Sequence, residues 1–147
     1  MSITEKLTQP PKRDQVVADC VTLVGEEVKS KGGLTGIAIK AGYGVVKAVK
    51  PAFVTEVVDG MLDEWVGKLS PFWDAWVQAG KPGSFADRLR NDAAAVAEKL
   101  LEVTDGRAKL AKNATVKKMY EKMRPTAKKH VEDAIPRLGA LVERHAA

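Results

Sequence analysis

The amino-acid sequence predicts a single all-α domain, a compact bundle of about six to eight helices that spans residues 1–147. Apolar residues recur at intervals of three and four over several long segments, which is the spacing of one face of an α-helix. Capping residues, glycines and prolines lie between these segments, where helices are expected to begin and end. No alternation of apolar and polar residues predicts a β-hairpin, and no strand–helix–strand unit is indicated.

The composition is that of a globular protein, with 45% hydrophobic and 29% charged residues. At 147 residues, folding removes about 70% of the surface of the unfolded chain, so the core needs no disulfide. The single Cys20 excludes an intramolecular disulfide and a cysteine-based zinc cluster, and it fits a reducing compartment. We find no secretory signal and no apolar run of the ~18–20 residues that cross a bilayer. The sequence therefore predicts a cytoplasmic protein without a membrane span.

Two helices are predicted at the start of the chain. Ser2 and Glu5 have the spacing of a capping box, which predicts a short leading helix that Pro10-Pro11 interrupts. Residues 1–11 are therefore a candidate for a loosely attached leading segment. The second helix, residues 12–29, has an apolar stripe with the helical period and ends before a pair of glycines.

A third helix is predicted from Leu34 to Lys50, although its three glycines each weaken a helix by about 1 kcal/mol relative to alanine. Lys40 and Lys47 share one face. The opposite face contains Ala38, Gly42, Val45 and Val49. Small residues at this spacing allow another helix to approach closely, either within the monomer or across a dimer.

The clearest amphipathic helix runs from Pro51 to Leu69, and the other helices are predicted to bury its apolar face. We expect Ser70-Pro71 to end this helix and to begin a short one, because serine caps helices and proline fits their first turn. For Trp73, core packing is favoured over an alternative in which it is exposed with Phe72 as a candidate partner-binding patch. The other two tryptophans are expected in the core.

Three further apolar stripes predict the C-terminal helices. The first covers residues 85–103, and we expect Asp105-Gly106 to break it. The second covers residues 116–123. Pro125 is predicted to open the last helix, whose phase continues past Pro136, so one kinked helix or two nearly collinear helices are expected.

Few residues indicate catalysis, and the chain has no phosphate-loop, dinucleotide-binding or zinc-protease motif. His130 and Asp133 lie one turn apart, but a metal site needs further ligands, so a boundary histidine beside surface acids is favoured. Asp59 and Asp63 lie opposite the apolar stripe, which favours a solvated acidic face over an acid/base pair. Cys20 lies on a valine stripe, which predicts an inert thiol. We therefore predict no enzyme, no cofactor and no metal.

The strongest functional indication is a basic run between residues 107 and 129, in a chain with a formal net charge of +5. Nine basic residues stand there against the single acid Glu121. Such a surface can neutralise nucleic-acid phosphates without reading sequence. A solvated face paired partly with the acidic middle of the chain is favoured over this alternative, and contact with anionic lipids ranks third. The candidate polyanion-binding residues are Arg107, Lys109, Lys112, Lys117, Lys118, Lys122, Arg124, Lys128 and Lys129.

Five short pieces of the sequence carry a resemblance to a known family. They are VVAD (Val16–Asp19), GLTGIAIK (Gly33–Lys40), PFW (Pro71–Trp73), AKKHVE (Ala127–Glu132) and IPRLG (Ile135–Gly139). Together they resemble a family of small bacterial proteins, frequent in actinobacteria, that is known only as a domain of unknown function. The resemblance covers nearly the whole chain. It implies a stand-alone cytoplasmic protein, and it implies no activity, cofactor or catalytic residue.

The leading functional hypothesis is a non-catalytic interaction or structural protein of the bacterial cytoplasm, which binds a protein partner or a second copy of itself. The alternative is a sequence-independent nucleic-acid-associated protein that uses the basic residues 107–129. An enzyme ranks third, because it needs a cleft with converging polar groups that the sequence does not indicate.

Overall fold

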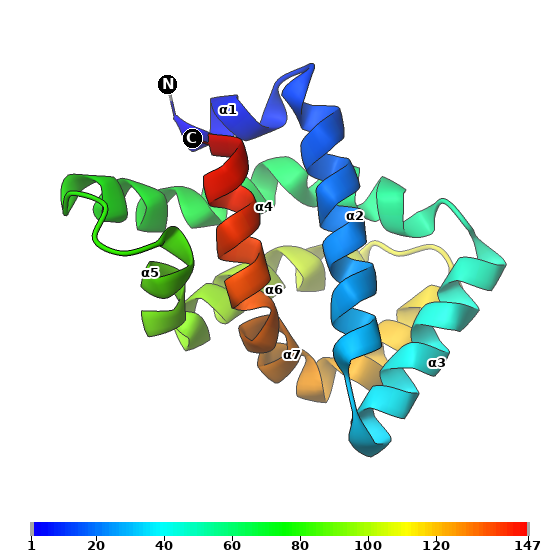
Figure 1. Cartoon of the computed structure of the whole chain (residues 1–147). Coiled ribbons are helices and arrows are strands. Elements are labelled where there is room, and N and C mark those ends of the chain that lie inside the picture. Colours follow the sequence, from blue (N-terminus) through cyan, green and yellow to red (C-terminus); the bar gives the residue numbers. More distant parts are fainter. Residues whose placement is uncertain (1, 147) are drawn as a thin grey trace.

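The computed structural model describes residues 2–146, with the backbone alone for Thr35. In this range the chain forms seven α-helices and no strand (Figure 1). They are α1 (Ile3–Thr8), α2 (Lys12–Ser30), α3 (Gly33–Val49), α4 (Phe53–Gln78), α5 (Phe85–Asn91), α6 (Ala93–Lys109) and α7 (Ala114–Ala146). The predicted fold class and number of helices are confirmed. None of the helices in residues 2–146 is long and apolar enough to cross a membrane.

The core lies between α2, α4, α6 and α7, in which α4 packs against α2 and α6, and α7 also packs against α2 and α6. In Figure 1, α2 and the C-terminal half of α7 lie side by side in front of α4 and α6. The two short helices α1 and α5 pack against α4 and the C-terminal half of α7. Helix α3 packs on α2 and on the N-terminal half of α7, at the right of the view.

The predicted break at Ser70-Pro71 is wrong, because α4 continues through Pro71. Leu69, Trp73 and Trp76 are all buried, and their spacing of four and three keeps the apolar stripe in phase across the proline. Proline removes one backbone hydrogen bond, and the carbonyl it leaves unpaired belongs to Gly67, which is exposed to water. Burial of the continuous stripe therefore outweighs the local signal to stop.

The predicted start of a new helix at Pro125 is also wrong, because α7 runs from Ala114 to Ala146 through both Pro125 and Pro136. Both prolines are on the exposed side, where water can reach the carbonyls that they leave without a donor. The expectation that the helical phase continues past Pro136 is confirmed. Asn113 caps the helix, since its Oδ1 accepts from the backbone N–H of Val116 at 3.1 Å.

The segment predicted as one stripe over residues 85–103 forms two helices, which meet at Asp92 with φ −113° and ψ 26°. The predicted break at Asp105-Gly106 does not occur, and α6 continues to Lys109. One helical glycine costs about 1 kcal/mol. The Asp105 carboxylate accepts from α7 side chains and so does not compete for its own backbone.

An aromatic cluster closes the core where α4 and α5 meet. The ring centroids of Trp73 and Phe85 are 4.9 Å apart in an edge-on arrangement, and those of Trp76 and Phe85 are 5.5 Å apart. Trp73 is 7% exposed and Phe72 is half-buried. The alternative in which these two residues form an exposed patch is therefore not what the structure shows, because Trp73 continues the buried stripe of α4.

Helix α3 is confirmed, and of the four small or apolar residues opposite its lysines only Gly42 is buried within the monomer. Ile39 and Gly42 are buried, and a Cβ on Gly42 would lie 3.1 Å from the Met123 sulfur on α7. Val45 and Val49 are 42% and 50% exposed, and Ala38 is exposed. The helix is apolar over most of its circumference, so its lysines alone could not decide which apolar side packs. An exposed apolar face that includes Leu34 and Ile37 remains.

The leading segment is not loosely attached, because Ile3 and Leu7 are each 1% exposed in the core. The predicted cap is present, since the Ser2 hydroxyl accepts from the backbone N–H of Glu5 at 3.2 Å. Helix α1 has only six residues and is too short to be stable alone. Burial of its apolar side therefore stabilises it.

Candidate functional site

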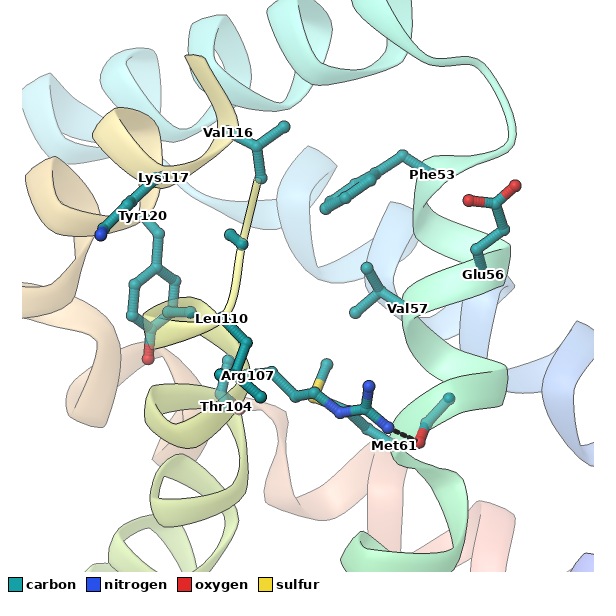
Figure 2. A pocket seen from close by; sticks show the side chains of 13 residues that line it. Phe53, Glu56, Val57, Met61, Thr104, Arg107, Leu110, Val116, Lys117 and Tyr120 are labelled. Atoms are coloured by element: carbon teal, nitrogen blue, oxygen red, sulfur yellow. Dashed lines mark hydrogen bonds between the residues drawn. The ribbon is translucent and has the colours of Figure 1, made fainter. Parts of the chain in front are cut away.

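A cleft of about 330 Å³ lies between α4, the end of α6 and the start of α7. Figure 2 shows Phe53 and Val57 pointing into it from α4, with Val116 and Leu110 on the opposite side. Met61, which is buried, lines its base. The walls are mainly apolar, and the volume is at the lower end of that of small-ligand sites.

Leu110 is the most unusual wall residue, because it is 75% exposed although it lines the cleft. It caps the end of α6, and the chain turns after it toward α7. A large apolar side chain at the mouth of an apolar cleft leaves a contact surface that only another molecule can cover.

Arg107 crosses one end of the cleft from α6 to α4. One Nη of its guanidinium donates to the backbone carbonyl of Gly60 on α4, as the dashed line in Figure 2 shows. Lys117 lines the α7 side, and its side chain is exposed and forms no ion pair among residues 2–146. Glu56, on the outer side of α4, is paired with Lys50 at 2.8 Å. The mouth of the cleft is therefore basic.

A polar cluster joins α6 to α7 beside the cleft. The Arg124 guanidinium donates to both oxygens of Asp105 at 2.8 and 3.1 Å, and the Tyr120 hydroxyl donates to the same carboxylate. Arg124 holds the pKa of Asp105 below its ordinary value, and burial, with the bond to Asp105, raises the pKa of Tyr120. Both groups are thus fixed in one protonation state near neutral pH, so this cluster positions helices and does not exchange protons.

The structure divides the nine predicted basic residues into two groups. Arg107 is bound to Gly60, Arg124 to Asp105, and Lys128 to Glu98 at 3.7 Å. The other six are exposed and form no ion pair with any residue between 2 and 146. They are Lys109, Lys112, Lys117, Lys118, Lys122 and Lys129. The expected pairing with the acidic middle of the chain therefore involves few of these residues.

The predicted acidic face at Asp59 and Asp63 is occupied by one cation. Arg13 of α2 donates to both carboxylates, at 2.9 Å each. Its guanidinium also donates to the backbone carbonyl of Asp59 at 2.7 Å. The two acids thus attach the start of α2 to α4.

The histidines and the cysteine lie apart from the cleft. Neither ring nitrogen of His130 has a hydrogen-bond partner among residues 2–146, and burial lowers the pKa of this imidazole. His145 Nε2 lies 2.6 Å from Asp19 Oδ2. Burial raises the pKa of the Cys20 thiol to about 11. Within residues 2–146 no group of three or more His, Cys, Asp or Glu side chains could hold a metal ion.

Sequence reasoning missed the apolar walls of the cleft. Leu110 lies at the end of a helix within the basic run, and a single leucine among lysines indicates an apolar side chain that is exposed to solvent. Phe53 and Val57 lie beside the predicted stripe of α4 but outside it, because they face the cleft and not the core. Only the position of the 110–113 connection against α4 brings these residues together.

Comparison with known proteins places the whole chain in one family. The model of a family described as "Family of unknown function (DUF6918)" matches residues 3–146. No curated protein and no solved structure matches the chain. The match confirms the resemblance predicted from the short sequence pieces, and the protein belongs to the family of unknown function DUF6918.

Proposed function

We propose that this protein is a non-catalytic interaction protein of the bacterial cytoplasm, and that the α4–α6–α7 cleft is its binding site for a partner protein. The observation that carries the proposal is Leu110, 75% exposed at the mouth of a 330 Å³ apolar cleft. The basic mouth adds a preference for partners in which acidic residues flank an apolar anchor side chain. The acids nearest the cleft, Asp105 and Glu56, are paired with cations, which further supports binding over catalysis.

The replacement Leu110→Glu tests this proposal. The exposed leucine contributes little to folding, so the free energy of unfolding should change by less than about 0.5 kcal/mol. A carboxylate at the apolar mouth should weaken partner binding at least about ten-fold. The measurement is affinity capture of the tagged protein's partner from native lysate, with nuclease, followed by titration of the captured protein.

The matched control is Leu34→Glu, which makes the same change at a leucine that is 87% exposed on α3. It should leave capture at the cleft unchanged. If both variants retain the partner with wild-type affinity, the cleft is not the interface. If Leu34→Glu alone loses it, the exposed face of α3 is the interface instead.

A second candidate function is backbone binding of nucleic acid, favoured by the six exposed lysines without an ion pair among residues 2–146. It requires that binding weaken steeply with salt, with a slope of about −0.9 in log K against log salt for each phosphate neutralised. Replacement of Lys117, Lys118 and Lys122 by Glu should reduce that slope by about three.

The measurement is fluorescence anisotropy of a labelled 20-base-pair duplex and a single strand, each titrated between about 50 and 200 mM salt. The control introduces the same charge change at Lys29, Lys40 and Lys47, which are also exposed. Equal losses in the two triple variants would show general attraction by net charge. Absence of binding by the wild-type protein at 50 mM salt would exclude this function.

A further inference from the structure

The core contains a second apolar cavity, which shares only Thr104 with the cleft, and we propose that it is a binding site for a small uncharged apolar molecule, such as an aromatic hydrocarbon or a short alkyl chain. The cavity has a volume of about 170 Å³ and lies between α2, α4, α6 and α7. Val58, Leu62, Leu100 and Leu141 form part of its wall, and each is at most 8% exposed.

The volume is large for a folded core. Protein interiors are packed as densely as organic crystals, and voids larger than one water molecule are few. A cavity of about 150 Å³ with a wall of leucine, isoleucine and phenylalanine remains dry and binds benzene or xenon. The cavity between these four helices has a similar volume and an apolar wall, here mainly of leucine and valine, and it is partly open on one side, so it offers a related kind of site that an apolar molecule can enter.

The polar groups at the cavity restrict the chemistry of its occupant. Thr104 Oγ1 and Trp65 Nε1 both donate to the backbone carbonyl of Leu100, at 3.2 and 3.3 Å. The Cys20 thiol stays neutral, since burial raises its pKa to about 11. None of the side chains that line the cavity is charged, as far as residues 2–146 are concerned. Water needs two to four polar partners in such a space, so an uncharged molecule without hydrogen-bonding groups fits best.

Part of the wall lies between α2 and α7, which run side by side in Figure 1. Leu23 and Val24 on α2, and Leu138 on α7, line the cavity and are only partly buried. Outside them, exposed ion pairs join the two helices, such as that of Arg144 with Asp19 at 3.1 Å. Exposed ion pairs contribute little to stability, so this seam can open locally and admit an apolar molecule.

Benzene is the probe for the test, and the first readout is ¹³C-methyl NMR of the leucines and valines. Benzene should shift the methyl resonances of Leu100 and Leu138 in a saturable manner, and leave those of Leu110 in the cleft and Leu34 on α3 unchanged. At ten times its Kd it should also raise the thermal midpoint by about 3–6 °C. Shifts at Leu110 alone, or none at all, would overturn the proposal.

A filled variant, Cys20→Leu with Val58→Ile, provides the second readout. The added carbon atoms should occupy the cavity, raise the thermal midpoint without benzene, and abolish the benzene-induced shifts. Val45→Ile, at a 42% exposed position on α3, is the control that should keep them. A filled variant that is less stable than the wild type would mean that the added atoms meet packed side chains, and it would contradict the cavity. A filled variant that still binds benzene would place the site elsewhere.

Discussion

Replacement of Gly139 by alanine should destabilise the protein by about 3 kcal/mol. Gly139 is buried in α7 where this helix crosses α5. A Cβ there would lie 2.9 Å from the backbone nitrogen and from the Cβ of Ala86, and closer still to its Cα. Two of these atoms are backbone and the third is the Cβ fixed to it, so none can rotate away and the two helices must separate. Urea unfolding at equilibrium measures the effect.

A loss of stability in Gly139→Ala is the opposite of what helix propensity alone predicts. Alanine is a better helix former than glycine by about 1 kcal/mol, so Gly→Ala in a helix normally stabilises. Gly67→Ala on α4 is the control, because Gly67 is exposed and a Cβ there would meet no atom within 4 Å. It should stabilise the protein by about 0.5–1 kcal/mol. A Gly139→Ala variant as stable as the wild type would refute the close crossing of α5 and α7.

Replacement of Phe85 by alanine should cost about 3–5 kcal/mol, the range for buried aromatic residues. Phe85 is 0% exposed, and its ring contacts both Trp73 and Trp76 at centroid distances of 4.9 and 5.5 Å. Its loss leaves a cavity beneath the two indoles and removes one edge-on and one tilted ring contact. Tryptophan fluorescence reports the change directly, and its emission maximum should shift to longer wavelength in the folded variant.

The control for the aromatic cluster is Phe72→Ala, at the neighbouring half-buried phenylalanine. Since part of that ring is already in contact with water, we expect a smaller loss, of about 1–2 kcal/mol. Urea unfolding of the two variants compares them on one scale. Equal losses of unfolding free energy would show that Phe72 is packed as deeply as Phe85, and that the contacts of Phe85 with the two tryptophans contribute no extra stability.

The phase of the apolar residues was sufficient to predict the fold class and most helices. It failed where a local signal opposes burial. Pro71 and Pro125 both lie on exposed sides of helices, where each costs one hydrogen bond, and burial of the continuous stripe outweighs that cost. The buried side of α3 could not be predicted either, because that helix is apolar over most of its circumference and its orientation is set by tertiary contacts with α2, α7 and α4.

The candidate site was less predictable than the fold. The basic residues could be identified in the sequence, but their partners could not. Arg107 binds the backbone carbonyl of Gly60, and Arg124 binds the carboxylate of Asp105. The first contact is to backbone, which no sequence pattern identifies. The apolar walls of the cleft are more than 50 residues apart in the chain, as Phe53 and Leu110 show. Only tertiary structure assembles them.

Helix α1 packs against the C-terminal turns of α7 as well as against α4 and α2, so its contacts with the core are completed late during translation. Ile3 and Leu7 are each 1% exposed, and Lys6 Nζ donates to the backbone carbonyl of Ala146 at 3.1 Å. Residues 3–8 leave the ribosome well before residues 141–146. The contacts between α1 and α7 therefore form only after α7 has been synthesised. A nascent chain that stops before α7 exposes apolar surface that α7 would cover, and chaperones can bind such a surface.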